Sequence, residues 1–220
     1  MNVALVELLV ADPPDAWRDA GFAVDPDGSC RVGSARMRLL GPDAGRGVIG
    51  WTLRAGHEGV RPDDIDGIAT TWIDGAPAAP AEAPVEPPVH PNGVTGIDHV
   101  VVLTPALART VAALEAIGLD VRRERDGSFG GRPMRQVFFR AGEVVIEVVG
   151  DPDAAGPGPA TLWGITHTVV DIDHTAALLA DRVGRVKDAV QPGRRITTLR
   201  HRDAGLSVAT AFISPYLPRS

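Results

Sequence analysis

The 220-residue sequence contains a single cysteine, Cys30, and a single lysine, Lys187. One cysteine cannot form an internal disulfide or a zinc site with several cysteine ligands. Schiff-base chemistry would depend on Lys187 alone. The first ten residues lack the basic start of a secretory signal and carry Glu7 inside an apolar run. We therefore expect a cytoplasmic protein, since a reducing compartment suits a chain without disulfides.

Long apolar runs and an excess of basic residues are also missing. No stretch approaches the ~18 uninterrupted apolar residues of a membrane span. The 22 basic and 28 acidic residues give a net charge of −6, which disfavours binding to nucleic acid or to an anionic membrane. The sequence has no Walker loop, Rossmann glycine fingerprint or nucleophile elbow, so we expect no nucleotide cofactor. The predicted partner is a small molecule.

Proline and alanine are concentrated in residues 76–95, which show neither helical nor strand periodicity. Such a composition is typical of a semi-extended linker. It predicts a division into a first segment (1–75), the linker (76–95) and a longer segment (96–216).

The longer segment repeats itself, because Gly96–Val102 (GIDHVVV) returns as Gly164–Val170 (GITHTVV) with five of seven positions identical. Each copy leads into a predicted helix and then three predicted strands, so each module reads β-α-β-β-β. The modules span 96–152 and 162–216. Their predicted helices are 105–117 and 173–183, and their later strands are 120–125, 134–140, 143–149, 185–190, 195–202 and 206–213.

The first segment has a weaker version of the same order. Strands are predicted at 3–10, 29–32, 35–40 and 48–54, and a short helix at 13–20 with Asp12 as its N-cap. Its first strand has no histidine. We therefore expect a degenerate, structural β-α-β-β-β-like module, whose exposed sheet edge a second copy of the chain could cover.

Because successive side chains of a strand point to opposite faces of a sheet, the sequence predicts which face three polar side chains of the modules occupy. If a helix covers Val100 and Val102, His99 points to the opposite face of the sheet, and the same parity applies to His167. In the last strand of the first module, Glu147 lies between valines, which is an unusual place for a carboxylate. Two facing modules would bring these side chains together as a two-histidine, one-carboxylate set suited to Fe, Mn, Zn or Ni.

A tandem β-α-β-β-β chain with these residues resembles the vicinal oxygen chelate superfamily, which includes glyoxalase I, bleomycin-resistance proteins, fosfomycin-resistance enzymes and extradiol dioxygenases. The resemblance implies an α+β fold in which paired modules form a cupped mixed sheet around a divalent metal. It implies that His99, Glu147 and His167 are metal ligands. The fourth ligand position falls on Thr210, a departure that argues against a four-ligand site of the glyoxalase I type and leaves Thr210 as a candidate for contact with the substrate.

Other residues are candidates for contacts with a ligand. Arg194 or Arg195 should face the cup, where an arginine could hold a carboxylate or phosphate, although both could instead be solvated. Phe138 could wall an apolar cavity, although such residues more often pack in a core. We expect the remaining histidines at the surface, in the linker or at a helix start; these are His57, His90, His174 and His201.

The sequence leaves two functions open. One is a metal-dependent lyase, isomerase or dioxygenase of the vicinal oxygen chelate type, acting on a small oxygen-bearing molecule. The other is a non-catalytic protein that sequesters a small molecule in the same cup, as bleomycin-resistance proteins do. Fold alone does not separate them.

Overall fold

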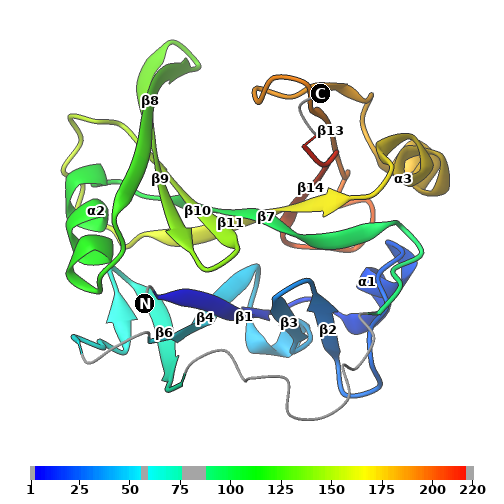
Figure 1. Cartoon of the computed structure of the whole chain (residues 1–220), viewed down its shortest axis with the longest axis horizontal. Helices are drawn as coiled ribbons and strands as arrows, with labels where there is room; N and C mark the ends of the chain where they lie inside the picture. Colours follow the sequence, from blue (N-terminus) through cyan, green and yellow to red (C-terminus); the bar gives the residue numbers. More distant parts are fainter. Residues whose placement is uncertain (1–2, 56–58, 76–87, 217–220) are drawn as a thin grey trace. The chain divides into compact units, whose positions relative to one another are not determined.

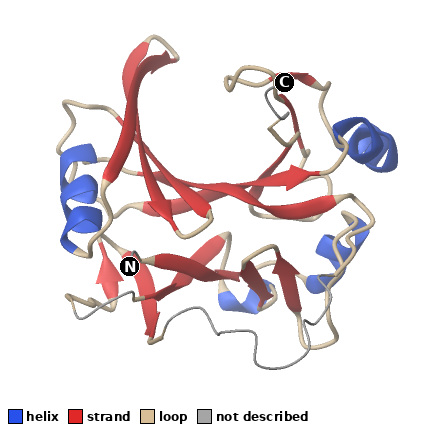
Figure 2. Cartoon of the chain, in the orientation of Figure 1, coloured by secondary structure: helices blue, strands red, loops and turns tan. Residues whose placement is uncertain are grey.

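The structure is a computed structural model that describes residues 3–55, 59–75 and 88–216. Most of its regular secondary structure is β-strand, with few and short helices (Figure 2). Residues 76–87 of the predicted linker and His57 lie outside the described residues. No described helix has both the length and the apolar composition needed to cross a membrane.

The chain forms two compact units that are interleaved along the sequence. Unit 1 comprises Met1–Leu8, Val48–Val85 and His99–Trp163, and unit 2 comprises Leu9–Gly47, Glu86–Asp98 and Gly164–Ser220. The boundary falls inside three strands: β1 (Ala4–Val10), β7 (Val94–Leu103) and β11 (Thr161–Val169). Each unit therefore combines one predicted module with part of the first segment.

The predicted first module lies in unit 1 and has the expected order of elements. After β7 come α2 (Leu107–Ala116), β8 (Val121–Phe129), β9 (Arg132–Ala141) and β10 (Val144–Gly150). The sheet order is β7-β10-β9-β8, with β10 parallel to β7 and antiparallel to β9 (Figure 1). Helix α2 contacts β10, and Val100 and Val102 are fully buried. The sheet therefore has one covered face and one partly exposed face, as the alternation predicts.

Unit 1 also contains strands from the first segment. Strand β4 (Val48–Arg54) pairs in parallel with β6 (Ile68–Ile73), which pairs antiparallel with β5 (Asp64–Ile65). The buried Trp51 indole donates to the hydroxyl of Thr70 over 2.7 Å. The β5-β6 hairpin is a feature that the sequence analysis did not predict.

Unit 2 contains the second module and the start of the first segment. The module strands β11 and β14 (Ala209–Ile213) are parallel, and β13 (Arg195–Thr198) pairs antiparallel with β14 and with β12 (Lys187–Asp188). Helix α3 (Ile172–Leu179) contacts β13 and β14. From the first segment come α1 (Pro14–Asp19) and the antiparallel pair β2 (Ser29–Val32) and β3 (Ala35–Leu39).

Helix boundaries differ from the prediction at two places in unit 2. Helix α3 gives way to a 3-10 turn at Ala180, whose φ of 50° breaks the helix before the predicted end at 183. Helix α1 has Pro13 as its N-cap and no side-chain cap. Asp12 instead accepts hydrogen bonds from the indole of Trp17 and from the main-chain and side-chain groups of Ser207.

The described end of the predicted linker packs into unit 2. His90 is only 4 % exposed, accepts a hydrogen bond from the Ala23 amide at Nδ1 and donates from Nε2 to the Arg31 carbonyl. The expectation that His90 lies in an open linker is therefore wrong, because both ring nitrogens are bonded inside the fold. His174, by contrast, is exposed as predicted.

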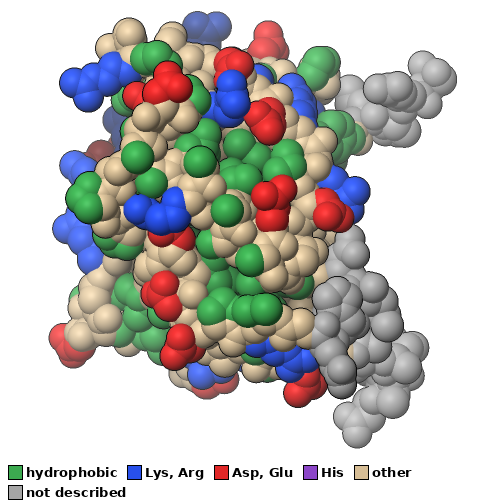
Figure 3. Space-filling model, turned by 90° about the vertical axis from the view of Figure 1, so that its left-hand side faces the viewer, with side chains coloured by type: hydrophobic (Ala, Val, Ile, Leu, Met, Phe, Trp, Pro, Cys, Tyr) green, Lys and Arg blue, Asp and Glu red, His purple; other side chains and the backbone are tan. Residues whose placement is uncertain are grey.

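On the face shown in Figure 3, basic and acidic side chains are interspersed, with apolar side chains between them. This mixed surface agrees with the absence of a basic footprint in the composition.

Candidate functional site

The partly exposed face of the β7-β10 pair in unit 1 carries two of the predicted site residues. His99 lies opposite Val145, and Glu147 lies opposite Val101. Residues opposite each other in neighbouring strands point to the same face, so His99 and Glu147 share one face of the sheet. Glu147 is 9 % exposed, whereas the neighbouring valines on this face are only partly buried.

His99 and Glu147 approach each other closely. The Nε2 atom of His99 lies 3.5 Å from Oε2 of Glu147, and both side chains are largely buried. The Gln136 amide, from β9, donates to Oε1 of Glu147. The amide oxygen of Gln136 is buried and has no hydrogen-bond partner among the described residues. An imidazole, a carboxylate and an unsatisfied acceptor therefore meet on this face.

This cluster suits two kinds of chemistry. A histidine and a carboxylate side by side can exchange protons with a bound molecule. They can also share a divalent cation, because two bonds of about 2.1 Å at a tetrahedral angle separate the donor atoms by about 3.4 Å. The observed 3.5 Å matches that separation, so the two side chains fit a metal.

A third protein ligand of the expected type is not found beside them. Within residues 3–55, 59–75 and 88–216, no group of three or more His, Cys, Asp or Glu side chains is arranged to hold a metal ion. Since catalytic zinc sites usually have three protein ligands, a metal at this pair would need further oxygen donors from water or a bound molecule.

His167 lies in unit 2 in an aromatic cluster. Its side chain is fully buried, and its ring centroid is 5.0 Å from that of Phe22, 6.1 Å from Phe212 and 6.2 Å from Trp17. On β11, its face is shared by the buried Ile165 and Val169. The face that His167 occupies is thus the covered face of its sheet, unlike that of His99.

Arg194 is buried in unit 2 and binds an internal carboxylate. Its Nη1 atom lies 2.9 Å from each carboxylate oxygen of Asp98, and its Nε donates to the Ser214 carbonyl over 2.6 Å. The guanidinium carbon lies 4.3 Å from the centre of the Tyr216 ring. Its charge is therefore already compensated within the fold.

The other predicted ligand contacts in unit 2 also have internal partners. Arg195 is exposed and pairs with Asp173 at the surface over 2.6 Å. This pair lowers the pKa of the Asp173 carboxyl and raises the pKa of Arg195. Thr210 is buried, and its hydroxyl donates to the Val208 carbonyl over 3.0 Å.

Phe138 lies on the same face as the His99–Glu147 pair. It is directly opposite Glu147 on β9 and only partly buried, and the guanidinium carbon of Arg123 lies 5.8 Å from its ring centre. The structure therefore brings together His99, Glu147 and Phe138, and places the other predicted site residues in the interior or at the surface of unit 2.

Gln136 is a site residue that the sequence analysis missed. On β9 its side chain points to the same face of the sheet as that of Phe138, and the strand register places it diagonally across from Glu147. Gln136 lies between the apolar, partly buried Met134 and Phe138 on the same face of β9, and a polar residue in that position was the signal that could have identified it.

A comparison with models of protein families found a match. The family model described as "Glyoxalase/Bleomycin resistance protein/Dioxygenase superfamily" matches residues 96–201. A comparison with curated proteins found no match.

Solved structures cover the chain beyond this segment. A mutant of 4-hydroxymandelate synthase from Streptomyces coelicolor matches 100% of this chain and 94% of its own, with 16% identity and a TM-score of 0.61. Catechol 2,3-dioxygenase matches 100% of this chain and 89% of its own, with 13% identity and a TM-score of 0.61. The structure of 2,2',3-trihydroxybiphenyl 1,2-dioxygenase from Sphingomonas wittichii matches 96% of this chain and 91% of its own, with 15% identity and a TM-score of 0.57. At these identities, the likeness shows the fold alone.

Proposed function

Because residues 96–201 match the model of the Glyoxalase/Bleomycin resistance protein/Dioxygenase superfamily, we propose that this protein binds a small oxygen-bearing molecule at the His99–Glu147 pair. The single observation that supports this site is the 3.5 Å approach of two largely buried, chemically active side chains on a partly exposed sheet face. In a purely structural sheet, such a face carries apolar or solvated side chains.

The proposal includes a divalent metal held by His99 Nε2 and the Glu147 carboxylate. When bound, the metal supplies a Lewis acid that polarises an oxygen of the ligand. Two protein ligands give weak retention, so a ligand with two neighbouring oxygens should tighten metal binding by completing the coordination shell. We leave His167 out of this site because its ring packs against Phe22 and Phe212.

The chain's own residues orient the ligand and handle protons. Gln136 donates to one oxygen of Glu147 and thereby fixes the plane of the carboxylate. The free amide oxygen of Gln136 is available to accept a hydrogen bond from a ligand hydroxyl. In the metal-free protein, where His99 Nε2 and the Glu147 carboxylate hold no cation, these two side chains are placed to take up or release a proton on the bound molecule.

Isothermal titration of Zn²⁺ into protein stripped with chelator tests the site. Zn²⁺ is redox-inactive, so a vicinal diol such as dihydrocaffeate can be added without being oxidised by the metal. We expect weak metal binding alone and at least about tenfold tighter binding with dihydrocaffeate present. His99→Ala or Glu147→Gln should abolish this gain, since each removes one of two protein donors.

The matched control is His201→Ala, which removes a histidine from a surface turn of unit 2. It should leave Zn²⁺ binding unchanged. Equal losses in all three variants, or unchanged binding in the His99 and Glu147 variants, would reject the metal site. Tight dihydrocaffeate binding that is the same with and without metal would favour a sequestering protein instead.

A further inference from the structure

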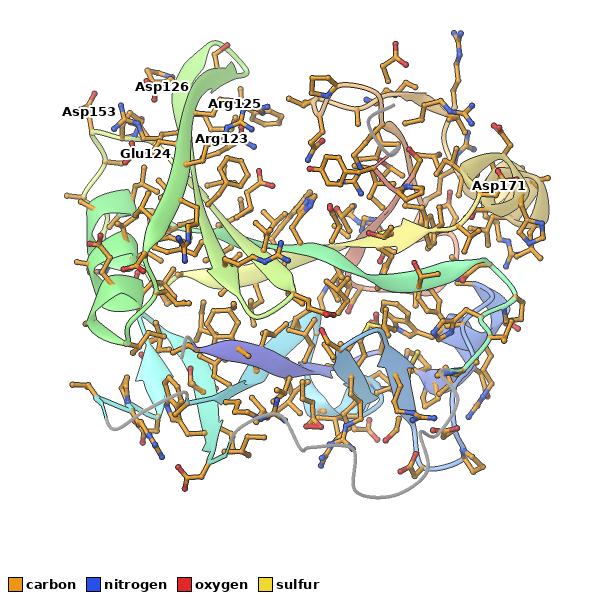
Figure 4. All side chains as sticks on the ribbon, viewed as in Figure 1. Arg123, Glu124, Arg125, Asp126, Asp153 and Asp171 are labelled. Atoms are coloured by element: carbon orange, nitrogen blue, oxygen red, sulfur yellow. The ribbon has the colours of Figure 1, made fainter. Side chains whose placement is uncertain are left out.

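Strand β8 separates its charges by face. Arg123 lies opposite Phe138, and Arg125 lies opposite Gln136, so both arginines share the face of the candidate site. Glu124 and Asp126 alternate with these arginines along β8 and therefore point to the opposite face of the sheet. Figure 4 shows Arg123 and Arg125 on one side of β8, and Glu124, Asp126 and Asp153 on the other.

The acidic side of β8 has its own counter-charge. The Arg135 guanidinium lies 2.6 Å from Asp126 and 3.3 Å from Glu124. This arrangement lowers the pKa of the Asp126 carboxyl and raises the pKa of Arg135. The acidic side chains are therefore already engaged and do not neutralise the arginines on the opposite face.

The two arginines on the site face have no carboxylate partner within the described part of the chain. The contact found for Arg123 is with the ring of Phe138, at 5.8 Å from its centre. Arg125 is partly buried despite its charge. A partly buried guanidinium is stable when an anion binds it, and two neighbouring arginines make a strong oxyanion site.

Cross-strand register connects these arginines to the His99–Glu147 pair. One row across the sheet runs Arg123, Phe138, Glu147, and the next row runs Arg125, Gln136, Val149. Neighbouring strands lie about 4.8 Å apart, so the arginine row is about 10 Å from Glu147. Phe138 fills the interval with an aromatic surface.

From this arrangement we propose that the ligand of the candidate site is an elongated anion, and that Arg123 and Arg125 bind its carboxylate or phosphate group. The inference rests on the proposed function and extends it to a substrate class. One end of the molecule carries the oxygens that meet His99 and Glu147. A planar or apolar body lies on Phe138, and the anionic group lies about 10 Å from the first end, over β8.

A pair of probes that differ in charge alone tests this assignment. Dihydrocaffeate carries a vicinal diol and a carboxylate at opposite ends, and dihydrocaffeamide replaces the carboxylate by an uncharged amide. We expect wild-type protein with Zn²⁺ to bind the acid about tenfold more tightly than the amide, because a charge-assisted hydrogen bond has that magnitude. Raised salt should reduce this ratio.

Arginine variants locate the charged subsite. Arg123→Gln and Arg125→Gln should each lower the affinity for the acid several-fold and leave the affinity for the amide nearly unchanged. Arg46→Gln removes one positive charge from an exposed loop of unit 2 and serves as the matched control. It should leave the acid-to-amide ratio unchanged. The phosphonate analogue of the acid distinguishes the source of the anion, since a phosphate-type site binds it more tightly than the carboxylate.

Failure of this inference is separable from failure of the proposed function. If acid and amide bind equally, or if Arg123→Gln and Arg125→Gln both keep the wild-type ratio, the anion subsite is wrong while the site at His99 and Glu147 stands. If neither probe binds, the proposed function itself fails. Urea unfolding of each variant verifies that these surface substitutions leave the fold intact.

Discussion

Arg194 Nη1 lies 2.9 Å from both carboxylate oxygens of Asp98, in a pair whose side chains are 2 % and 13 % exposed. Removing one partner of such a pair leaves a buried charge without compensation. We therefore expect Asp98→Asn or Arg194→Met to lower the free energy of unfolding by about 3–5 kcal/mol, measured by urea denaturation.

The control for this prediction is Arg195→Met, next along the chain. Its guanidinium pairs with Asp173 at the surface, where solvent screens the interaction. It should change the stability much less than either variant of the buried pair. Similar stabilities for Asp98→Asn and wild type would show that the pair does not hold the fold.

The aromatic cluster around His167 leads to a second prediction. His167→Ala removes a fully buried ring from contact with Phe22 and Phe212, and should cost about 2–4 kcal/mol of stability through the cavity it leaves. Zn²⁺ uptake by the folded variant should match wild type. If the folded variant lost Zn²⁺ binding, His167 would have to be counted among the metal ligands, contrary to this prediction.

The neutral imidazole of His90 makes stability depend on pH. Burial lowers its pKa in the folded protein from 6.5, although its bond to the Arg31 carbonyl acts in the opposite direction. As pH falls below 6.5, the unfolded chain gains a proton that the folded chain resists, so stability present above 6.5 declines. One such group contributes at most about 1.4 kcal/mol per pH unit.

Urea unfolding at about pH 7.5 and about pH 5.5 measures this effect. The decline in stability on acidification should be smaller in His90→Asn than in wild type. The lowered pKa values of Asp27, Asp126 and Asp173 affect the stability mainly below about pH 5, where carboxyls of the unfolded chain take up protons, and so do not interfere in this range. An equal decline in both proteins would exclude His90 as the titrating group.

Cys30 should be unreactive while the protein is folded. Burial, aided by the charge of Asp25, raises the pKa of its thiol to about 12. At about pH 8 the thiolate fraction is then about one in ten thousand, too small for rapid exchange. An aromatic disulfide reagent should react with the thiol only in denaturant, and fast reaction in buffer would contradict the burial of β2.

The sequence predicted the elements more successfully than the directions of their side chains. Periodicity and glycine boundaries located the last strand of the first module to within one residue, at 143–149 against β10, whereas β8 runs four residues beyond its predicted end at 125. The short β5-β6 hairpin was missed because its two-residue first strand has no periodicity to detect.

Similar motifs, identical at five of seven positions, led to different environments for His99 and His167. In β7 the fully buried partners are Val100 and Val102, whereas in β11 the fully buried face includes His167 itself. A shift of one residue in a strand moves every side chain to the other face, and the sequence motif does not fix which face packs against a neighbouring segment. The aromatic partners Trp17 and Phe22 come from more than a hundred residues earlier in the chain, so local reasoning could not anticipate them.

The hydrogen bonds between Asp12 and Ser207 join residues 195 positions apart, and this separation governs the order of events during synthesis. Asp12 is 1 % exposed, and a buried carboxylate without its donors is costly. Asp12 therefore gains the Ser207 donors only once the chain has been made as far as the strand that follows Ser207, and contacts between residues so far apart in sequence slow folding.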